Sequence, residues 1–192
     1  TFVTFFQKKH LGLMFFFLLT YRLGESQLVK IASPFLLDKH AEGGLELSTA
    51  TVGMIYGTIG VIALLLGGVL GGIVVSRHGF RRWILPMALA INLPDALYIY
   101  LSAVHPDAWQ VIVAVAIEQL GYGFGFTAYM LYLIYIAEGE HKTAHYAIGT
   151  GFMALGMMLP GMAAGWIQDT IGYTAFFIWV CICTLPGILA SV

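Results

Sequence analysis

The sequence predicts an all-α membrane protein with six transmembrane helices. Of its 192 residues, 59% are hydrophobic and only 10% are charged, and the mean hydropathy is +0.86. Soluble domains have about 45–50% apolar and about 25% charged residues, so this composition excludes a soluble globular domain and a disordered segment. The formal net charge of −1 provides no basic surface for phosphate backbones, so nucleic acid is not expected as a partner.

Six apolar segments divide the chain, and each approaches the roughly 20 residues that a helix needs to cross a bilayer. We expect helices because an open sheet leaves backbone groups unsatisfied in lipid, and the alternation typical of barrel strands is absent. The chain begins at a threonine and ends inside an apolar stretch, so we expect a piece of a longer protein. The expected spans cover residues 11–37, 49–75, 83–104, 110–137, 144–165 and 173–192.

The loop cations predict the orientation of these spans. Six of them are expected on one face of the membrane and one on the other, and the richer face is usually cytoplasmic. Both ends of the segment are therefore expected in the cytoplasm, with the lipid bilayer as the surrounding partner. The six are Lys8, Lys9, Arg77, Arg81, Arg82 and Lys142, and the single cation opposite is Lys39.

Glycines four residues apart recur in the second, fourth and fifth spans. Such pairs let helix backbones approach closely, so we interpret them as packing positions rather than ligand contacts. The pairs are Gly67 and Gly71, Gly68 and Gly72, Gly121 and Gly125, and Gly161 and Gly165.

The strongest local pattern is GGIVVSRHGFRR, residues 71–82, between the second and third spans. Basic residues at such a turn can contact the carbonyl groups at helix C-termini. The stretch resembles motif A of the major facilitator superfamily, G-x-x-x-D-R-x-G-R-R, although Ser76 replaces the aspartate and Phe80 replaces a common basic residue. An ordinary basic cytoplasmic loop is the alternative interpretation. The matching positions are Gly72, Arg77, Gly79 and Arg81, with Arg82 beside them.

Charged side chains interrupt the first span, in the stretch FLLTYRLGESQLVKIASPFLL. Arg22, Glu25 and Lys30 fall on one broad helical face together with two serines, by the helical period. Buried charges in a span usually face a bundle interior or an aqueous cavity, so this face is a candidate substrate-binding surface. Alternatively, Arg22 and Glu25 simply neutralise each other, since they lie three residues apart; that pair does not explain Lys30.

Two further acids lie inside spans. Glu118 precedes a glycine- and tyrosine-rich stretch of the fourth span, and it can pair with a cation, bind substrate or exchange a proton. Tyr122 and Tyr129 in that stretch offer flat rings with a polar tip, suited to sugar rings, to packing or to the membrane interface. Asp95 in the third span is either a proton site or a structural polar contact. The proton-coupling candidates are therefore Glu118, Glu25 and Asp95.

Four segments together resemble AmpG-type muropeptide permeases. The run from Tyr21 to Leu37 looks like the seventh helix of that family, with its R-L-G-acid stretch and P-F-L-L ending. The run from Glu118 to Thr127 resembles the tenth-helix pattern E-N-L-x-x-G-x-G-x-x, with Gln119 in place of the usual asparagine. HYAIGTGFMALGMMLPGMAAGWIQDTIGY resembles the eleventh helix, and TLPGIL resembles part of the last helix.

This resemblance implies the C-terminal six-helix half of a twelve-helix major facilitator superfamily transporter. It implies proton-coupled import of anhydromuropeptides, amino-sugar peptides from the cell wall, across the bacterial inner membrane. The N-terminal half of the same transporter is then the missing partner. In that superfamily, the helices equivalent to the first, second, fourth and fifth spans line the cavity. The resemblance therefore favours Arg22, Glu25, Lys30 and Glu118 as site residues and makes Asp95 a weaker candidate.

Other classes of function fit the sequence less well. A carrier of the same fold for a sugar, a drug or acetyl-CoA is the main alternative. A rhomboid-like protease needs a GxSG motif, which is absent, and all six histidines fall in loops or at helix edges. No catalytic residue, metal site or cofactor is therefore expected. A channel would need a ring of charges or a carbonyl filter, and neither pattern is present.

Overall fold

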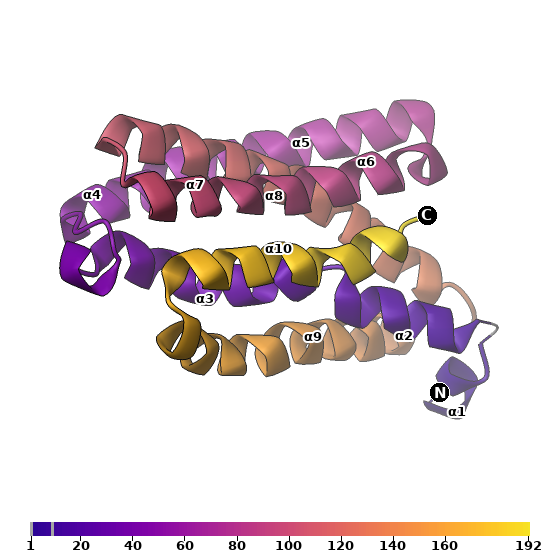
Figure 1. Ribbon diagram of the computed structural model, residues 1–192. Helices are drawn as coiled ribbons and strands as arrows, with labels where there is room; N and C mark the ends of the chain where they lie inside the picture. Colours follow the sequence, from indigo (N-terminus) through magenta and orange to yellow (C-terminus); the bar gives the residue numbers. More distant parts are fainter. Residues whose placement is uncertain (1, 9) are drawn as a thin grey trace.

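The computed structural model describes residues 2–8 and 10–192, and every regular element in those residues is a helix (Figure 1). Lys9, one of the loop cations counted above, lies outside the described residues. The α-helices are α1 (Phe2–Phe6), α2 (Leu11–Thr20), α3 (Leu23–Leu37), α4 (Thr49–Met54), α5 (Val61–His78), α6 (Phe80–Asn92), α7 (Ala96–Val104), α8 (Ala108–Ala137), α9 (Lys142–Ile171) and α10 (Tyr173–Leu189). The 3₁₀ turns are η1 (His40–Glu42) and η3 (Leu93–Asp95), and η2 (Ile55–Gly60) is a π-helix.

Four helical stretches of the described residues are long and apolar enough to cross a membrane: Thr49–His78, Phe80–Val104, Ala108–Ala137 and Lys142–Ile171. The α10 helix is apolar but has only 17 residues. The expected first span is divided, because α2 and α3 are separate helices of 10 and 15 residues.

The division of the first span falls at Tyr21 and Arg22. Arg22 has φ −116° and ψ 23°, which lies outside the α-helical range. One turn earlier, the carbonyl oxygen of Leu18 accepts a hydrogen bond of 2.7 Å from the Tyr129 hydroxyl. The Tyr21 hydroxyl donates a bond of 2.9 Å to the carbonyl oxygen of Gly125. Two tyrosines therefore join this bend to α8, and a side chain that bonds into the helical hydrogen-bond ladder is one of the recognised causes of a kink.

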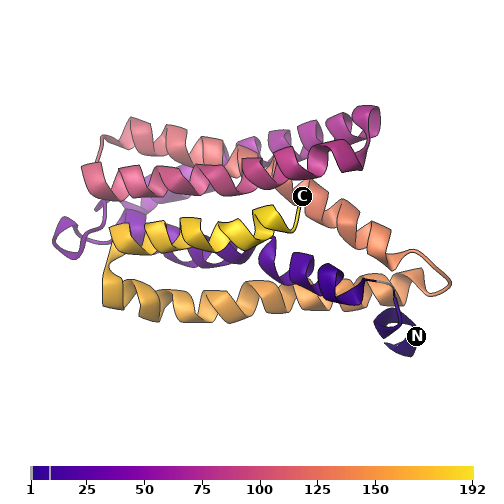
Figure 2. The same ribbon diagram turned by 45° about the vertical axis from the view of Figure 1, so that its right-hand side comes forward.

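The α8 helix packs against α5 and α6 on one side of the molecule, whereas α3 lies beside α9 and α10 (Figures 1 and 2). Glycines make the first set of contacts close. A Cβ atom at Gly67 would lie 2.1 Å from the Leu120 carbonyl oxygen, and one at Gly123 would lie 2.0 Å from that of Leu64. A Cβ at Gly121 would lie 2.1 Å from the Ala90 carbonyl oxygen, on α6.

The packing interpretation of the glycine pairs is therefore confirmed for α5 against α8 and for α8 against α6. At Gly72 and Gly165 an added Cβ would meet no atom within 4 Å, so within the described chain these two glycines make no close helix contact. These two glycines fall on helix surfaces that no other described element covers.

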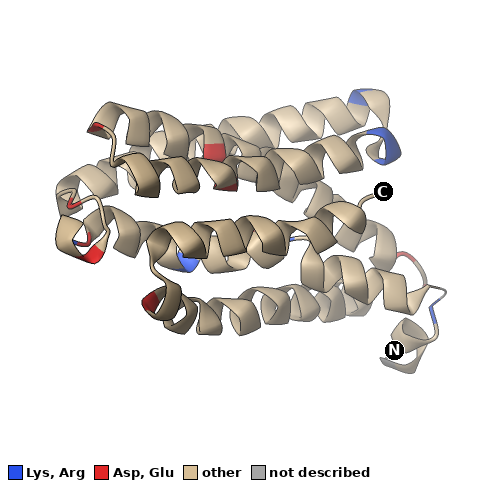
Figure 3. Cartoon of the chain, in the orientation of Figure 1, with Lys and Arg blue, Asp and Glu red and all other residues tan. Residues whose placement is uncertain are grey.

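The two ends of the chain and the turn between α5 and α6 lie at the same end of the bundle (Figures 1 and 2). That turn carries Arg77, Arg81 and Arg82, and Figure 3 shows these cations gathered at the tip of the bundle. The loop after α3, which carries Lys39, lies at the opposite end (Figures 1 and 3).

Two apolar clusters fill the interior, and polar residues lie between them. One cluster contains Leu28, Tyr98 and Val115, and the other contains Tyr21, Ile91 and Ala128. Along the first, third and fourth expected spans, the chain passes from one cluster to the other through charged or amide side chains. These buried polar residues are Arg22, Glu25, Gln27, Asn92, Asp95 and Glu118.

Candidate functional site

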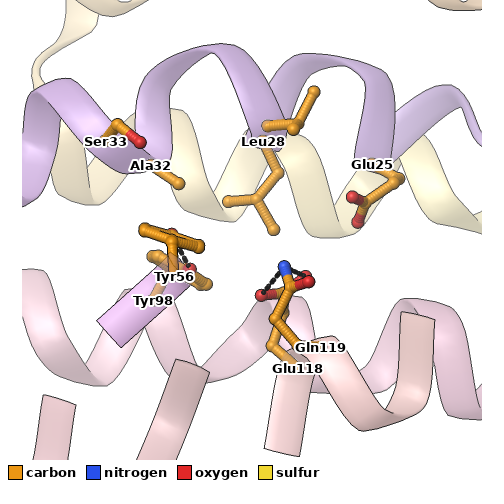
Figure 4. Close-up of a pocket in the computed structure, with 9 residues that line it drawn as sticks. Glu25, Leu28, Ala32, Ser33, Tyr56, Tyr98, Glu118 and Gln119 are labelled. Carbon is orange, nitrogen blue, oxygen red and sulfur yellow. Dashed lines mark hydrogen bonds between the residues drawn. The ribbon is translucent and has the colours of Figure 1, made fainter. Parts of the chain in front are cut away.

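A cavity of about 120 Å³ lies between α3, η2, α7 and α8 (Figure 4). One face of α3 lines it with residues at helical spacing, from Glu25 at one end to Ser33 at the other. The opposite wall comes from Tyr56 of η2, Tyr98 of α7, and Glu118 and Gln119 of α8. The lining residues are Glu25, Leu28, Val29, Ala32, Ser33, Tyr56, Tyr98, Glu118 and Gln119.

Two of the predicted acids, Glu25 and Glu118, face each other across this cavity (Figure 4). Glu25 is 2% exposed, and its Oε2 atom has no hydrogen-bond partner. Both carboxylate oxygens of Glu118 accept from the side-chain nitrogen of Gln119, at 3.3 Å and 3.0 Å. A buried carboxylate needs hydrogen bonds, a counter-ion or a proton. The Oε2 atom of Glu25 lacks the hydrogen bond.

The third predicted acid, Asp95, lies behind the cavity rather than on its wall. It is fully buried, and neither of its carboxyl oxygens has a hydrogen-bond partner. A Cβ atom at Gly24 would lie 3.5 Å from its Oδ2, so Asp95 packs against the start of α3, next to Glu25. The three carboxyl groups lie within electrostatic range of one another. No three His, Cys, Asp or Glu side chains of the described chain form a group that could hold a metal ion.

Arg22 lies at the bend of the first span and reaches α8. Its guanidinium carbon lies 5.0 Å from the centre of the Tyr122 ring and 4.8 Å from that of Phe126, and these two rings are stacked. Its Nη2 donates a hydrogen bond to the Tyr122 hydroxyl, while its buried Nε has no partner. The bond to Tyr122 differs from the simple neutralisation by Glu25 that the spacing of Arg22 and Glu25 suggested.

Lys30 and Tyr129 lie apart from the cavity. Lys30 is exposed, and its aliphatic carbons lie against Gly161 of α9, on a different side of α3 from Glu25. Tyr129 is 1% exposed, and its hydroxyl is bound to the Leu18 carbonyl oxygen. In this conformation its ring is therefore buried against the bend rather than presented to a solute. Arg22, Glu25, Glu118 and Tyr122 remain together in the middle of the bundle.

The residues of the motif A-like turn occupy the tip between α5 and α6. Gly79 has φ +82°, a backbone conformation that favours glycine, and it ends α5 and begins α6. The side chains of Arg77, Arg81 and Arg82 are exposed, and Gly72 lies on the open surface of α5.

Sequence reasoning missed Tyr56, Tyr98 and Gln119 as members of this site. The hydroxyl groups of Tyr56 and Tyr98 form a hydrogen bond of 2.8 Å across the end of the cavity. Tyr56 lies on the π-helix η2, and π-helical turns occur frequently at functional sites. In the sequence, Tyr56 is followed by Gly57 and Gly60. A single tyrosine in an apolar span does not indicate which residue its hydroxyl contacts, so the pair with Tyr98 could not be predicted.

No family model matches the chain. The anhydromuropeptide permease of Escherichia coli (strain K12) is 24% identical over 185 residues, which cover 96% of this chain and 37% of the permease. The chain resembles the AmpG-type permeases. Putative transporter AmpG 1 of Rickettsia bellii (strain RML369-C) is 25% identical over 92% of this chain and 42% of its own length.

A third AmpG-type relative extends the match almost to both ends. Putative transporter AmpG 4 of Rickettsia conorii (strain Malish 7) is 25% identical over 187 residues, which cover 97% of this chain. The chain spans 37–44% of the length of these AmpG-type relatives. Together with the four long apolar helices, the likeness to permeases identifies an integral membrane protein.

Proposed function

We propose that this chain is the C-terminal six-helix half of a proton-coupled transporter of the major facilitator type, which imports anhydromuropeptides. The observation that carries the proposal is the match of AmpG-type permeases along 92–97% of the chain. In this proposal the divided pair α2 and α3 and the 17-residue α10 also cross the bilayer, which completes six spans with the four long ones.

The orientation belongs to the same proposal. The turn with Arg77, Arg81 and Arg82 lies in the cytoplasm, as does the end of the bundle that holds both chain ends. The loop after α3 then faces the outer side. In a bacterium the membrane is the inner membrane, and the solute moves from the outer side to the cytoplasm.

The buried polar residues supply the chemistry that such a substrate needs. A muropeptide carries carboxylates, and an arginine can bind a carboxylate through two parallel hydrogen bonds. The buried Nε of Arg22 has no partner, so the guanidinium has donor capacity left for a substrate. Tyr122 positions Arg22 and offers a ring to the sugar, and the exposed Lys30 supplies a second cation.

The acids supply the coupling. A carboxyl group inside a membrane takes up a proton when it is isolated from water and releases it when its cavity opens to water. Glu118 and Glu25 line the cavity and are the main candidates, while Asp95 lies behind them. Rocking of two halves around a site near the membrane midplane gives alternating access, so the N-terminal half is a required partner.

Uptake by vesicles that contain the full-length transporter tests the proposal. Labelled anhydromuropeptide is offered with and without an inward proton gradient, and accumulation is expected only with the gradient. A free amino sugar and acetyl-CoA are offered in parallel. Accumulation of one of these instead would show that the transporter carries another solute. Equal uptake with and without the gradient would refute proton coupling.

A further inference from the structure

We propose that the cavity between α3 and α8 is a water-filled proton path to the outer side, and that the Tyr56–Tyr98 hydroxyl pair relays protons along it. The proposal rests on the proton-coupled function above and adds the route by which protons reach the acids. Three observations carry it: the shape of the cavity, its polar lining, and the contact between the two tyrosines.

The cavity has the size and the lining of a water site. Its volume of about 120 Å³ has room for about four water molecules at roughly 30 Å³ each. Buried water requires polar partners, and the walls supply two carboxyl groups, an amide and three hydroxyl groups. The unpartnered Oε2 of Glu25 gives such a water an acceptor at the inner end.

The cavity runs along α3 toward the outer end of that helix. From Glu25 to Ser33 it extends about 12 Å at the helical rise, and α3 ends one turn later at Leu37. On the cytoplasmic side of Glu25, the tightly packed ring of Tyr21 and the buried Tyr129 belong to an apolar cluster. In this conformation the cavity therefore extends from the acids toward the outer end of α3 and not toward the cytoplasm.

The two tyrosines stand beside this route. Their hydroxyl oxygens are 2.8 Å apart, and a hydroxyl can accept one proton while donating another. A proton from outer water enters through waters near Ser33, passes along the hydroxyl pair and cavity waters, and ends on the Glu118 carboxylate, which becomes a carboxylic acid. Each hydroxyl gives up one proton for each that it receives, so both tyrosines are unchanged after the transfer.

The other ionisable groups around the route have defined places. Glu25 faces Glu118 from α3, and Asp95 of η3 lies behind Glu25 near Gly24. Arg22 lies one turn toward the cytoplasm from Glu25 and is bound to Tyr122. Since Arg22 lies beyond the Glu25 end of the cavity, its charge opposes escape of a proton toward the cytoplasm in this conformation.

The first test is transport by the full-length protein with Tyr56→Phe, which removes the hydroxyl and keeps the ring. Gradient-driven accumulation is expected to fall about tenfold, while substrate counterflow at equal pH on both sides stays at the wild-type rate. The matched control is Tyr135→Phe, because Tyr135 is 66% exposed and far from the cavity. Wild-type accumulation by Tyr56→Phe would overturn the relay. Absence of gradient-driven accumulation in the unmutated protein would instead refute proton coupling.

The second test measures water in the cavity and does not depend on transport. With Cys181 and Cys183 replaced by serine, Ala32→Cys is expected to react with a small, charged, membrane-impermeant methanethiosulfonate added from outside. Ala164→Cys is the matched control, because both alanines are buried but only Ala32 lines the cavity. Labelling of Ala32→Cys at least tenfold faster than Ala164→Cys supports the path, and equal labelling overturns it.

Discussion

The guanidinium carbon of Arg22 lies 5.0 Å from the centre of the Tyr122 ring, and Arg22 also donates a hydrogen bond to the hydroxyl of that tyrosine. The two residues come from the bend of the first span and from the middle of α8, which are far apart in sequence. A cation held over a ring in a desolvated place contributes about 2 kcal/mol. This contact fixes the position of the cation that the proposed function assigns to the substrate.

Replacing Arg22 with alanine in the full-length transporter is expected to abolish uptake while the protein remains folded in the membrane. The change removes the cation and its bond to Tyr122, and a charge-assisted contact contributes about 1.5–3 kcal/mol. Uptake of labelled substrate and thermal unfolding in detergent are measured together. Lys39→Ala, at an exposed cation of the outer loop, is the control and should transport normally. Normal uptake by Arg22→Ala would remove Arg22 from the binding site.

Glu118→Gln is expected to uncouple uptake from the proton gradient more than it weakens exchange of substrate. Glutamine has nearly the same shape as glutamate but cannot take up and release a proton between pH 5 and 8. The measurement compares accumulation across a series of outer pH values with counterflow at equal pH. Glu42→Gln, at an exposed acid, keeps the wild-type profile. If Glu118→Gln accumulated substrate with the unaltered pH dependence, Glu118 would have no part in the proton path.

Gly123→Ala is expected to destabilise the helix bundle. The added methyl group would lie 2.0 Å from the Leu64 carbonyl oxygen, so α5 and α8 must separate, and overpacking of this kind costs about 1–3 kcal/mol. Gly165→Ala is the matched control, since an added Cβ there meets nothing within 4 Å. Thermal unfolding in detergent should show a lower midpoint only for Gly123→Ala. Equal midpoints for both variants would contradict the close approach of the two helices.

Tyr129→Phe is expected to lower stability through loss of one buried hydrogen bond. The Leu18 carbonyl oxygen would then lose its tyrosine partner, and an unsatisfied buried group costs about 1–3 kcal/mol. The control is Tyr135→Phe at an exposed tyrosine, which should leave the unfolding midpoint unchanged. If uptake instead fell at unchanged stability, Tyr129 would act on the substrate, as its position in the tyrosine-rich stretch first indicated.

The helical membrane architecture was predictable from the sequence because it depends on composition and on segment length. Burial of Arg22, Glu25 and Glu118 followed from the same reasoning, since charges in an apolar span must face inward. The division of the first span was not predictable, because apolar residues continue on both sides of it. The bend is joined to the Gly125 carbonyl oxygen and to the Tyr129 hydroxyl, which lie 104 and 111 residues from their partners Tyr21 and Leu18 along the chain, so a local pattern does not contain them.

The grouping of the charged residues was predicted only in part. Helical period placed Glu25 and Lys30 on one broad face, but the bundle assigns Glu25 to the cavity and Lys30 to the side next to α9. A broad face spans several neighbours, and only the packed helices decide which neighbour each side chain meets. The π-helix that carries Tyr56 has no sequence pattern as clear as the helical period, so the tyrosine pair was not predicted.

The bend of the first span has a consequence for how freely its own residues can change. Both tyrosines that hold it bind main-chain oxygens, of Leu18 and Gly125, rather than side chains. A main-chain oxygen is present whatever residue occupies the position, so another apolar residue at position 18 keeps the acceptor in place. The bend of this helix therefore depends on the side chains of Tyr21 and Tyr129. Leu18 can be replaced by another apolar residue during evolution while the bend persists.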